Sequence, residues 1–193
     1  QEEFKKIRIR NFIEESILHD KTQRAETLLE KYYEMMKSSG NVSKMYYFRT
    51  KAYICLHGKN DIEEAYKNIK SALRCTLPEG QRQEMGSYLI STYEMENLLL
   101  LGKILFLQGK IQEAEILVRK CLKYMKEHPI DEEEKAKIFP KCVWVLTQIN
   151  KEKENHQEII FLCEEAIAML RKWAITYFML PLMQELVLRY EQI

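Results

Sequence analysis

The side chains that most often carry enzyme chemistry or hold metals are scattered along this sequence. No HExxH pair or Cys/His cluster occurs, and the four histidines lie mostly at expected turns: His19, His57, His128 and His156. A zinc site needs three or four such ligands at close spacing, so the sequence predicts no metal site. No GxSxG motif for a nucleophilic serine occurs either. We therefore expect no cofactor, no catalytic residues and no enzyme activity.

Two further stretches invite a chemical interpretation. "GKILFLQGK" (Gly102 to Lys110) contains two Gly-Lys pairs, but six residues separate its glycines and no Ser or Thr follows Lys110. It lies in an expected helix, so it is not a phosphate-binding loop. The acidic run from Asp131 to Glu134 could hold paired carboxylates, but it fits the first turn of a helix, where the macrodipole favours negative charge.

The five cysteines point to a reducing compartment. They are Cys55, Cys75, Cys121, Cys142 and Cys163; their number is odd, no CxxC pair occurs, and three of the five fall on apolar helix faces. Small buried thiols fit this pattern better than a disulfide framework. The sequence shows no signal peptide and no apolar run long enough to span a membrane. We expect a cytoplasmic protein without membrane contact.

An apolar stripe at helical spacing recurs along the chain. From Ala114, the residues at +3, +4, +7 and +11 are apolar and lie on one helix face, between Gly109 and Pro129. The same offsets from Ala25, Ala65 and Ile159 give apolar residues at all but two positions, Asn68 and Thr76. Repeats about 40 to 50 residues apart are typical of an α-solenoid made of two-helix units. A small residue at the start of the stripe would let a neighbouring helix backbone come close.

The predicted fold class is therefore all-α: a right-handed α-solenoid of tetratricopeptide-like helical hairpins with about nine helices. We expect one domain over residues 1–193, with a long helix from about Gln83 to Leu107 and a helix interrupted and kinked at Pro140. Asp61 is an expected N-cap, with Glu64 completing a capping box. The expected hairpins cover about 1–40, 41–80, 81–129 and 130–175, followed by a capping helix over 176–193.

Charge argues against direct binding of nucleic acid by this chain. The 30 basic and 29 acidic residues give a net charge of +1. The one basic stretch, Lys5 to Arg10, has glutamates on both sides and fits a solvated helix face.

The first helices of the expected hairpins are the more apolar, as in "MYYF" (Met45 to Phe48) and "LLLL" (Leu98 to Leu101). In a helical solenoid these helices line the concave face, and polar or aromatic residues on them are candidates for ligand contact. Aromatic rings would hold apolar side chains, Asn and Gln would bond peptide amides, and Arg and Lys would meet carboxylates. Packing within the core or plain solvation remains an alternative for each candidate. The candidates are Tyr47, Arg49, Tyr53, Tyr93, Asn97, Lys103, Lys141, Trp144 and Gln148.

The sequence also resembles a known family. Leu101, Gly102 and Ala114 stand at the Leu-Gly and Ala positions of a tetratricopeptide repeat. "PIDEEEKAKIFPKCVWVLTQI" and "EIIFLCEEAIAMLRKWAITYFMLPLMQEL" resemble the C-terminal half of bacterial regulators that carry a Cro/cI-type helix-turn-helix domain. Such proteins occur in Clostridia and are similar in architecture to peptide-pheromone-sensing regulators of Gram-positive bacteria. No helix-turn-helix domain is present in this chain, and Leu99 and Leu100 stand where peptide-sensing relatives place Asn.

The resemblance implies a regulatory domain that senses a short peptide or protein segment in its groove. DNA would then be contacted by a separate N-terminal domain. The alternative is a purely structural role, in which the array dimerises the regulator through exposed apolar residues such as Tyr177 to Met183. A third hypothesis, DNA binding by this chain itself, is disfavoured by the balanced charge.

Overall fold

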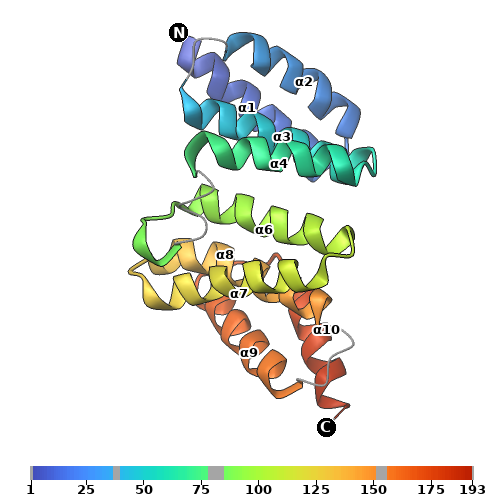
Figure 1. The fold of residues 1–193 in the computed structure, drawn as a ribbon, viewed down its shortest axis with the longest axis vertical. Helices are drawn as coiled ribbons and strands as arrows, with labels where there is room; N and C mark the ends of the chain where they lie inside the picture. Colours follow the sequence, from blue (N-terminus) through green and yellow to red (C-terminus); the bar gives the residue numbers. More distant parts are fainter. Residues whose placement is uncertain (1, 37–39, 78–84, 151–155, 193) are drawn as a thin grey trace. The chain divides into compact units, whose positions relative to one another are not determined.

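The computed structural model describes residues 2–36, 40–77, 85–150 and 156–192. The chain divides into two compact units, Gln1–Glu84 and Met85–Ile193. The described residues form nine α-helices and one short 3-10 helix, with no strand among them (Figure 1). The prediction of an all-α fold built from helical hairpins is confirmed. The single domain over 1–193 stays a prediction, and each unit is described below by itself.

Unit 1 consists of two helical hairpins. The first is α1 (Glu2–Leu18) with α2 (Thr22–Met35), and the second is α3 (Asn41–Gly58) with α4 (Ile62–Thr76). Consecutive helices pack against each other. An apolar and aromatic core cluster joins α1, α2 and α3: Ile13, Ala25, Leu29, Tyr32, Met36, Tyr46 and Ile54.

Unit 2 begins with a 3-10 turn, η1 (Met85–Ser87), and continues with five α-helices. Its two hairpins pair α6 (Thr92–Leu107) with α7 (Ile111–Glu127), and α8 (Glu132–Ile149) with α9 (His156–Lys172). The last helix, α10 (Met179–Tyr190), packs on α9 and α8. Because α6 also packs on α8, the first helices of the two hairpins lie side by side, and α7 and α9 cover them.

The repeated stripe marks the buried side of the second helices, as expected. Ala25, Ala65 and Ala114 are fully buried, and Ile159 is nearly so. A Cβ atom at Gly102 of α6 would lie 2.9 Å from Cγ2 of Val118 and 3.9 Å from the carbonyl oxygen of Ala114. The small residues at these positions therefore let α6 and α7 approach closely.

Polar caps set where several helices begin. The Asp131 carboxylate accepts hydrogen bonds from the backbone N–H groups of Glu133 and Glu134, so the acidic run is a helix start. The Asp61 carboxylate accepts from Glu64 N–H at 2.9 Å. The Glu64 carboxylate, however, accepts from Asn68 Nδ2 at 3.1 Å, so no reciprocal bond to Asp61 forms the expected capping box.

One expected helix start and one expected interruption of a helix were wrong. The helix expected from Gln83 begins instead at Thr92, because Ser91 and Glu94 form a capping box that stops the helix from extending toward the N-terminus. Residues 83 and 84 of that expectation lie outside the described residues. Pro140 does not interrupt α8, which runs as one helix with Pro140 buried inside it.

The segment before α6 is fastened to the end of α7. The Tyr124 hydroxyl accepts a hydrogen bond from Ile90 N–H at 2.7 Å and donates one to the Tyr88 carbonyl oxygen at 3.1 Å. The His128 ring stacks on Tyr124 with centroids 4.0 Å apart, and its Nε2 lies 3.2 Å from the Gly86 carbonyl oxygen. These contacts hold residues 86–90 against the C-terminal end of α7.

A buried ion pair holds α10. Arg189 Nε donates to Glu185 Oε1 at 2.8 Å, and the two side chains are only 3% and 8% exposed. The same guanidinium lies 3.4 Å from the Asn150 carbonyl oxygen and 3.4 Å from His156 Nδ1. Arg189 thereby joins α10 to the end of α8 and the start of α9.

Candidate interaction face

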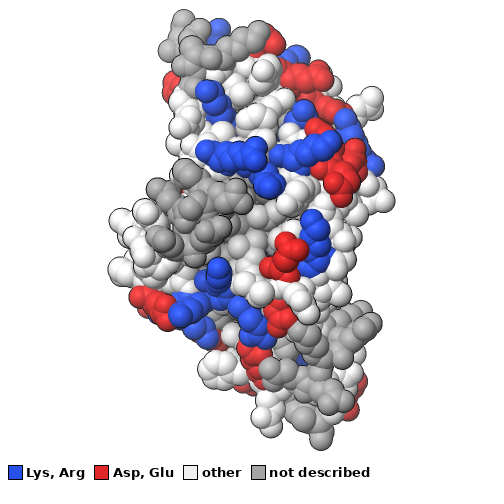
Figure 2. Space-filling model, viewed as in Figure 1, with Lys and Arg blue, Asp and Glu red and all other residues white. Residues whose placement is uncertain are grey.

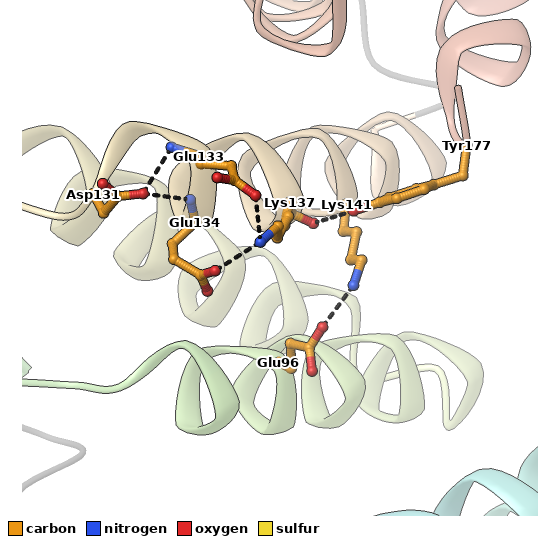
Figure 3. Close-up of polar contacts among 7 residues, drawn as sticks. All are labelled: Glu96, Asp131, Glu133, Glu134, Lys137, Lys141 and Tyr177. Atoms are coloured by element: carbon orange, nitrogen blue, oxygen red, sulfur yellow. Dashed lines mark hydrogen bonds and ion pairs between the residues drawn. The ribbon is translucent and has the colours of Figure 1, made fainter. Parts of the chain in front are cut away.

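The first helices of unit 2 share a surface that we call the α6–α8 face. We define it by Tyr93 and Glu96 of α6, Lys137, Lys141 and Trp144 of α8, and Tyr177 in the turn before α10. Residues three and four apart lie on one side of a helix, which places Lys137, Lys141 and Trp144 together on α8. Figure 3 shows the polar part of this face.

Lys137 lies between two carboxylates of its own helix. Its Nζ is 2.8 Å from Glu134 Oε1 and 2.9 Å from Glu133 Oε1 (Figure 3). The hydrogen bonds to Glu134 and Glu133 raise the pKa of Lys137, and the bond to Lys137 lowers the pKa of Glu134. Lys137 and Glu134 are therefore both charged at neutral pH and form an ion pair in the first turns of α8.

Lys141 connects three segments of unit 2. Its Nζ is 2.6 Å from Glu96 Oε1 of α6, and the two side chains are 31% and 28% exposed. The same Nζ lies 5.7 Å from the centroid of the Tyr177 ring, whose hydroxyl donates to the Lys137 carbonyl oxygen at 3.3 Å (Figure 3). A partly covered ammonium between a carboxylate and an aromatic face holds α6, α8 and the turn before α10 in fixed register.

Aromatic rings flank this polar centre. Tyr93 is 58% exposed one turn before Glu96, and Tyr177 is 44% exposed beyond Lys141. Trp144, half-buried, follows Lys141 by three residues. Aromatic residues beside charged ones are typical of protein interfaces, where a ring buries a large area at a small entropic cost.

The structure places six of the nine candidate residues in unit 2. Tyr93 lies on α6 and shares the α6–α8 face with Lys141 and Trp144, while Gln148 continues the α8 side of that face. Lys103 is half-buried on α6, and burial lowers the pKa of its ammonium. Asn97 is fully buried, and within the described part of the chain neither polar atom of its side chain has a hydrogen-bond partner.

The other three candidates lie on α3 in unit 1, on two different sides of the helix. The guanidinium of Arg49 lies 5.7 Å from the Tyr46 ring, and Tyr53 packs beside His57 one turn further along. Tyr47 faces α2 instead, with its ring 4.9 Å from that of Tyr33. It lines a hollow of about 350 Å³ between α2, α3 and α4. The structure does not bring Tyr47 together with Arg49 and Tyr53.

Sequence reasoning missed Glu96, Lys137 and Tyr177 as members of the face. The ion pairs of Lys137 could have been predicted from the sequence, because Glu133 and Glu134 precede it by four and three residues on a predicted helix. The contacts of Glu96 and Tyr177 could not have been predicted, because they depend on the register of segments about 40 residues apart in sequence.

Basic side chains also gather on unit 1. Figure 2 shows a row of Lys and Arg side chains over α4, whose basic residues are Lys67, Lys70 and Arg74. Lys67 pairs with Glu64 at 3.6 Å, and the ammonium of Lys70 lies 5.3 Å from the Tyr66 ring. Two of the three charges therefore have partners on their own helix, as in a solvated helix face.

The described residues show neither a metal-ligand cluster nor an exposed cysteine. They include no group of three or more His, Cys, Asp or Glu side chains that could hold a metal ion. All five cysteines are free thiols, and burial raises the pKa of Cys121 and of Cys163 to about 12. The thiolate is the nucleophilic form, so burial makes these thiols unreactive at neutral pH. None of the described helices combines the length and apolarity needed to cross a membrane.

No protein-family model matches the chain, and no curated protein matches it.

Proposed function

We propose that this chain is a protein-interaction module whose α6–α8 face binds a short peptide or a segment of another protein. The observation that carries the proposal is the ion pair between Lys141 and Glu96, held across two helices and flanked by the exposed rings of Tyr93 and Tyr177. Such a surface offers apolar area to side chains and polar groups to a peptide backbone.

The resemblance to Cro/cI-type regulators supports a role for this module as the signal-receiving half of a transcription regulator. In that setting, binding at the first helices would shift the array between two arrangements and change the activity of a DNA-binding domain. The chain itself would not contact DNA, in keeping with its net charge of +1. Its five free thiols fit a reducing, cytoplasmic setting.

The test is a peptide screen read by intrinsic fluorescence and calorimetry. Short hydrophobic peptides that bind the face should change the emission of Trp144 in a Trp173→Phe background. Trp144→Ala and Lys141→Met should each weaken binding about tenfold or more. Lys123→Met is the matched control, because Lys123 lies on α7 with its side chain 73% exposed. Unchanged affinity in both face variants, or no binding of any peptide, would reject the proposal.

A second candidate function is dimerisation through α10. Leu180, Met183 and Val187 are spaced three and four residues apart, and they are 64%, 41% and 56% exposed. An apolar helix side left open to water is a common feature of subunit interfaces. The test is sedimentation at micromolar concentration. Val187→Glu should convert a dimer to a monomer, while Gln184→Glu on the same helix should not; a wild-type monomer would exclude this candidate.

A further inference from the structure

Unit 2 has a concave site on the side of α8 away from the α6–α8 face. A hollow of about 330 Å³ lies where α7 ends, α8 begins and α9 ends. Its volume is near the lower limit for small-molecule pockets, about 300–1,000 Å³. Lys135 lines it, whereas Lys137, two residues later and about 200° around the helix axis, belongs to the α6–α8 face.

The floor of the hollow is apolar and adaptable. Met125 of α7 is buried, and Met169 of α9 and Ile130 of the α7–α8 turn are half-buried. The indole of Trp173, 36% exposed, lies at the end of α9. Two thioethers and an indole form a surface that accepts flat or flexible apolar groups.

The rim carries more positive than negative charge. Lys172 pairs with Glu132, which joins α9 to α8. Lys126 pairs with Glu165 at 3.2 Å. The charge of Lys135 also acts on Glu132: after the hydrogen bond and charge of Lys172, it helps to lower the pKa of that carboxyl. Glu132, the one carboxylate of the lining, is therefore shared between Lys172 and Lys135, and the rim keeps an excess of positive charge beside an apolar floor.

We infer that this hollow binds a small organic acid, with a single carboxylate on Lys135 and an aliphatic or aromatic body on Met125, Met169 and Trp173. The charge of Lys135 selects an anion, and the floor selects a molecule with apolar area. A neutral molecule would leave the excess positive charge of the rim without an anion, and a highly charged anion would leave the floor uncovered. This site is separate from the proposed peptide-binding face, so either proposal can fail alone.

The experiment uses the full chain with Trp144→Phe, so that Trp173 is the one remaining indole. Phenylacetate and hexanoate are titrated while Trp173 emission is recorded, and phenylacetamide serves as the uncharged match. We expect saturable binding of both acids, with the amide weaker by about tenfold or more. Equal binding of acid and amide, or no saturation at millimolar acid, overturns the inference.

Variants locate the carboxylate. Lys135→Met keeps the length of the side chain and removes its charge, so it should lower acid affinity about tenfold or more. Lys123→Met, an exposed lysine of α7 outside the hollow, should leave acid affinity unchanged. Circular dichroism melting verifies that both variants fold. If Lys135→Met binds the acids as tightly as the wild type does, Lys135 does not hold the carboxylate. If the hollow binds the C-terminal carboxylate of a peptide but neither free acid, the inference of a small-acid site is also overturned.

Discussion

The two units place their charged side chains differently. The hollow of unit 1 is lined by four carboxylates and two lysines, and the ion pair between Lys59 and Glu26 beside it is 50% and 39% exposed. In unit 2, the pair between Arg189 and Glu185 is almost fully buried. The hollow of unit 2, nearly equal in volume, has methionines and an indole at its floor.

Because the two ion pairs differ in burial, we expect them to differ in how much each stabilises its own unit. Exposed pairs contribute little to stability, because water already solvates both partners. A buried pair is costly to break, because the remaining charge stays in an apolar environment. We therefore expect loss of the buried Arg189–Glu185 pair to destabilise unit 2 strongly, and loss of the exposed Lys59–Glu26 pair to destabilise unit 1 weakly.

The largest effect is expected from Arg189→Met. It leaves the Glu185 carboxylate buried without its partner and should destabilise unit 2 by about 3–5 kcal/mol. Urea unfolding followed by residue-resolved hydrogen exchange measures the loss in each unit. The double variant Glu185→Gln with Arg189→Met removes both charges and should recover part of the loss. Equal losses in the single and double variants would show that the charge is not the cause.

The next effect concerns the packing of α6 on α7. Gly102→Leu forces a side chain into a place where even a Cβ would lie 2.9 Å from Val118 Cγ2. Overpacking of this kind should cost unit 2 about 1–3 kcal/mol. Gly40→Leu in unit 1 is the control, since a Cβ there meets nothing within 4 Å. A loss that hydrogen exchange finds equally in both units would mean that they unfold as one.

Low pH should destabilise unit 2 by protonating Glu158. Its hydrogen bonds with Arg119 lower its pKa, so its stabilising contribution is present above the ordinary glutamate pKa, about 4.3. That contribution is lost as pH falls through the lowered pKa. Glu158→Gln should flatten this part of the curve of unfolding free energy against pH, by about 1 kcal/mol or less because the pair is a third exposed. An unchanged curve between pH 2 and 5 would contradict the assignment.

The smallest effect is expected at Lys59 in unit 1. Its hydrogen bond to Glu26 raises the pKa of Lys59. The stabilisation of unit 1 by this ion pair is therefore present below the ordinary lysine pKa, about 10.4, and is lost as pH rises through the raised pKa. Lys59→Met should cost less than about 1 kcal/mol at pH 7. Chemical denaturation with and without 1 M salt measures it. A loss comparable to that of Arg189→Met would overturn the comparison between the units.

Much of the fold was readable from the sequence, because helices obey local rules. The apolar stripes from Ala25, Ala65, Ala114 and Ile159 gave the buried sides of the second helices. Local chemistry was misread in two places: at Ser91, where a capping box starts α6, and at Pro140, which the helix accommodates.

The candidate site was less predictable. Tyr93, Lys141 and Trp144 were chosen because they lie on predicted first helices, and the structure places them on α6 and α8. The partner of Lys141 was not predictable, because Glu96 lies 45 residues earlier and meets it only through the register of α6 and α8. The hollow of unit 2 was missed for the same reason, since its lining comes from the ends of three helices.

The fastening of residues 86–90 by Tyr124 and His128 has a practical consequence for recombinant work. A gene fragment intended to produce the second unit alone should start at Met85 and not at the first helical residue, Thr92. The shorter product would expose the Tyr124 ring and remove the acceptor of its hydroxyl, and we expect it to be recovered in lower yield.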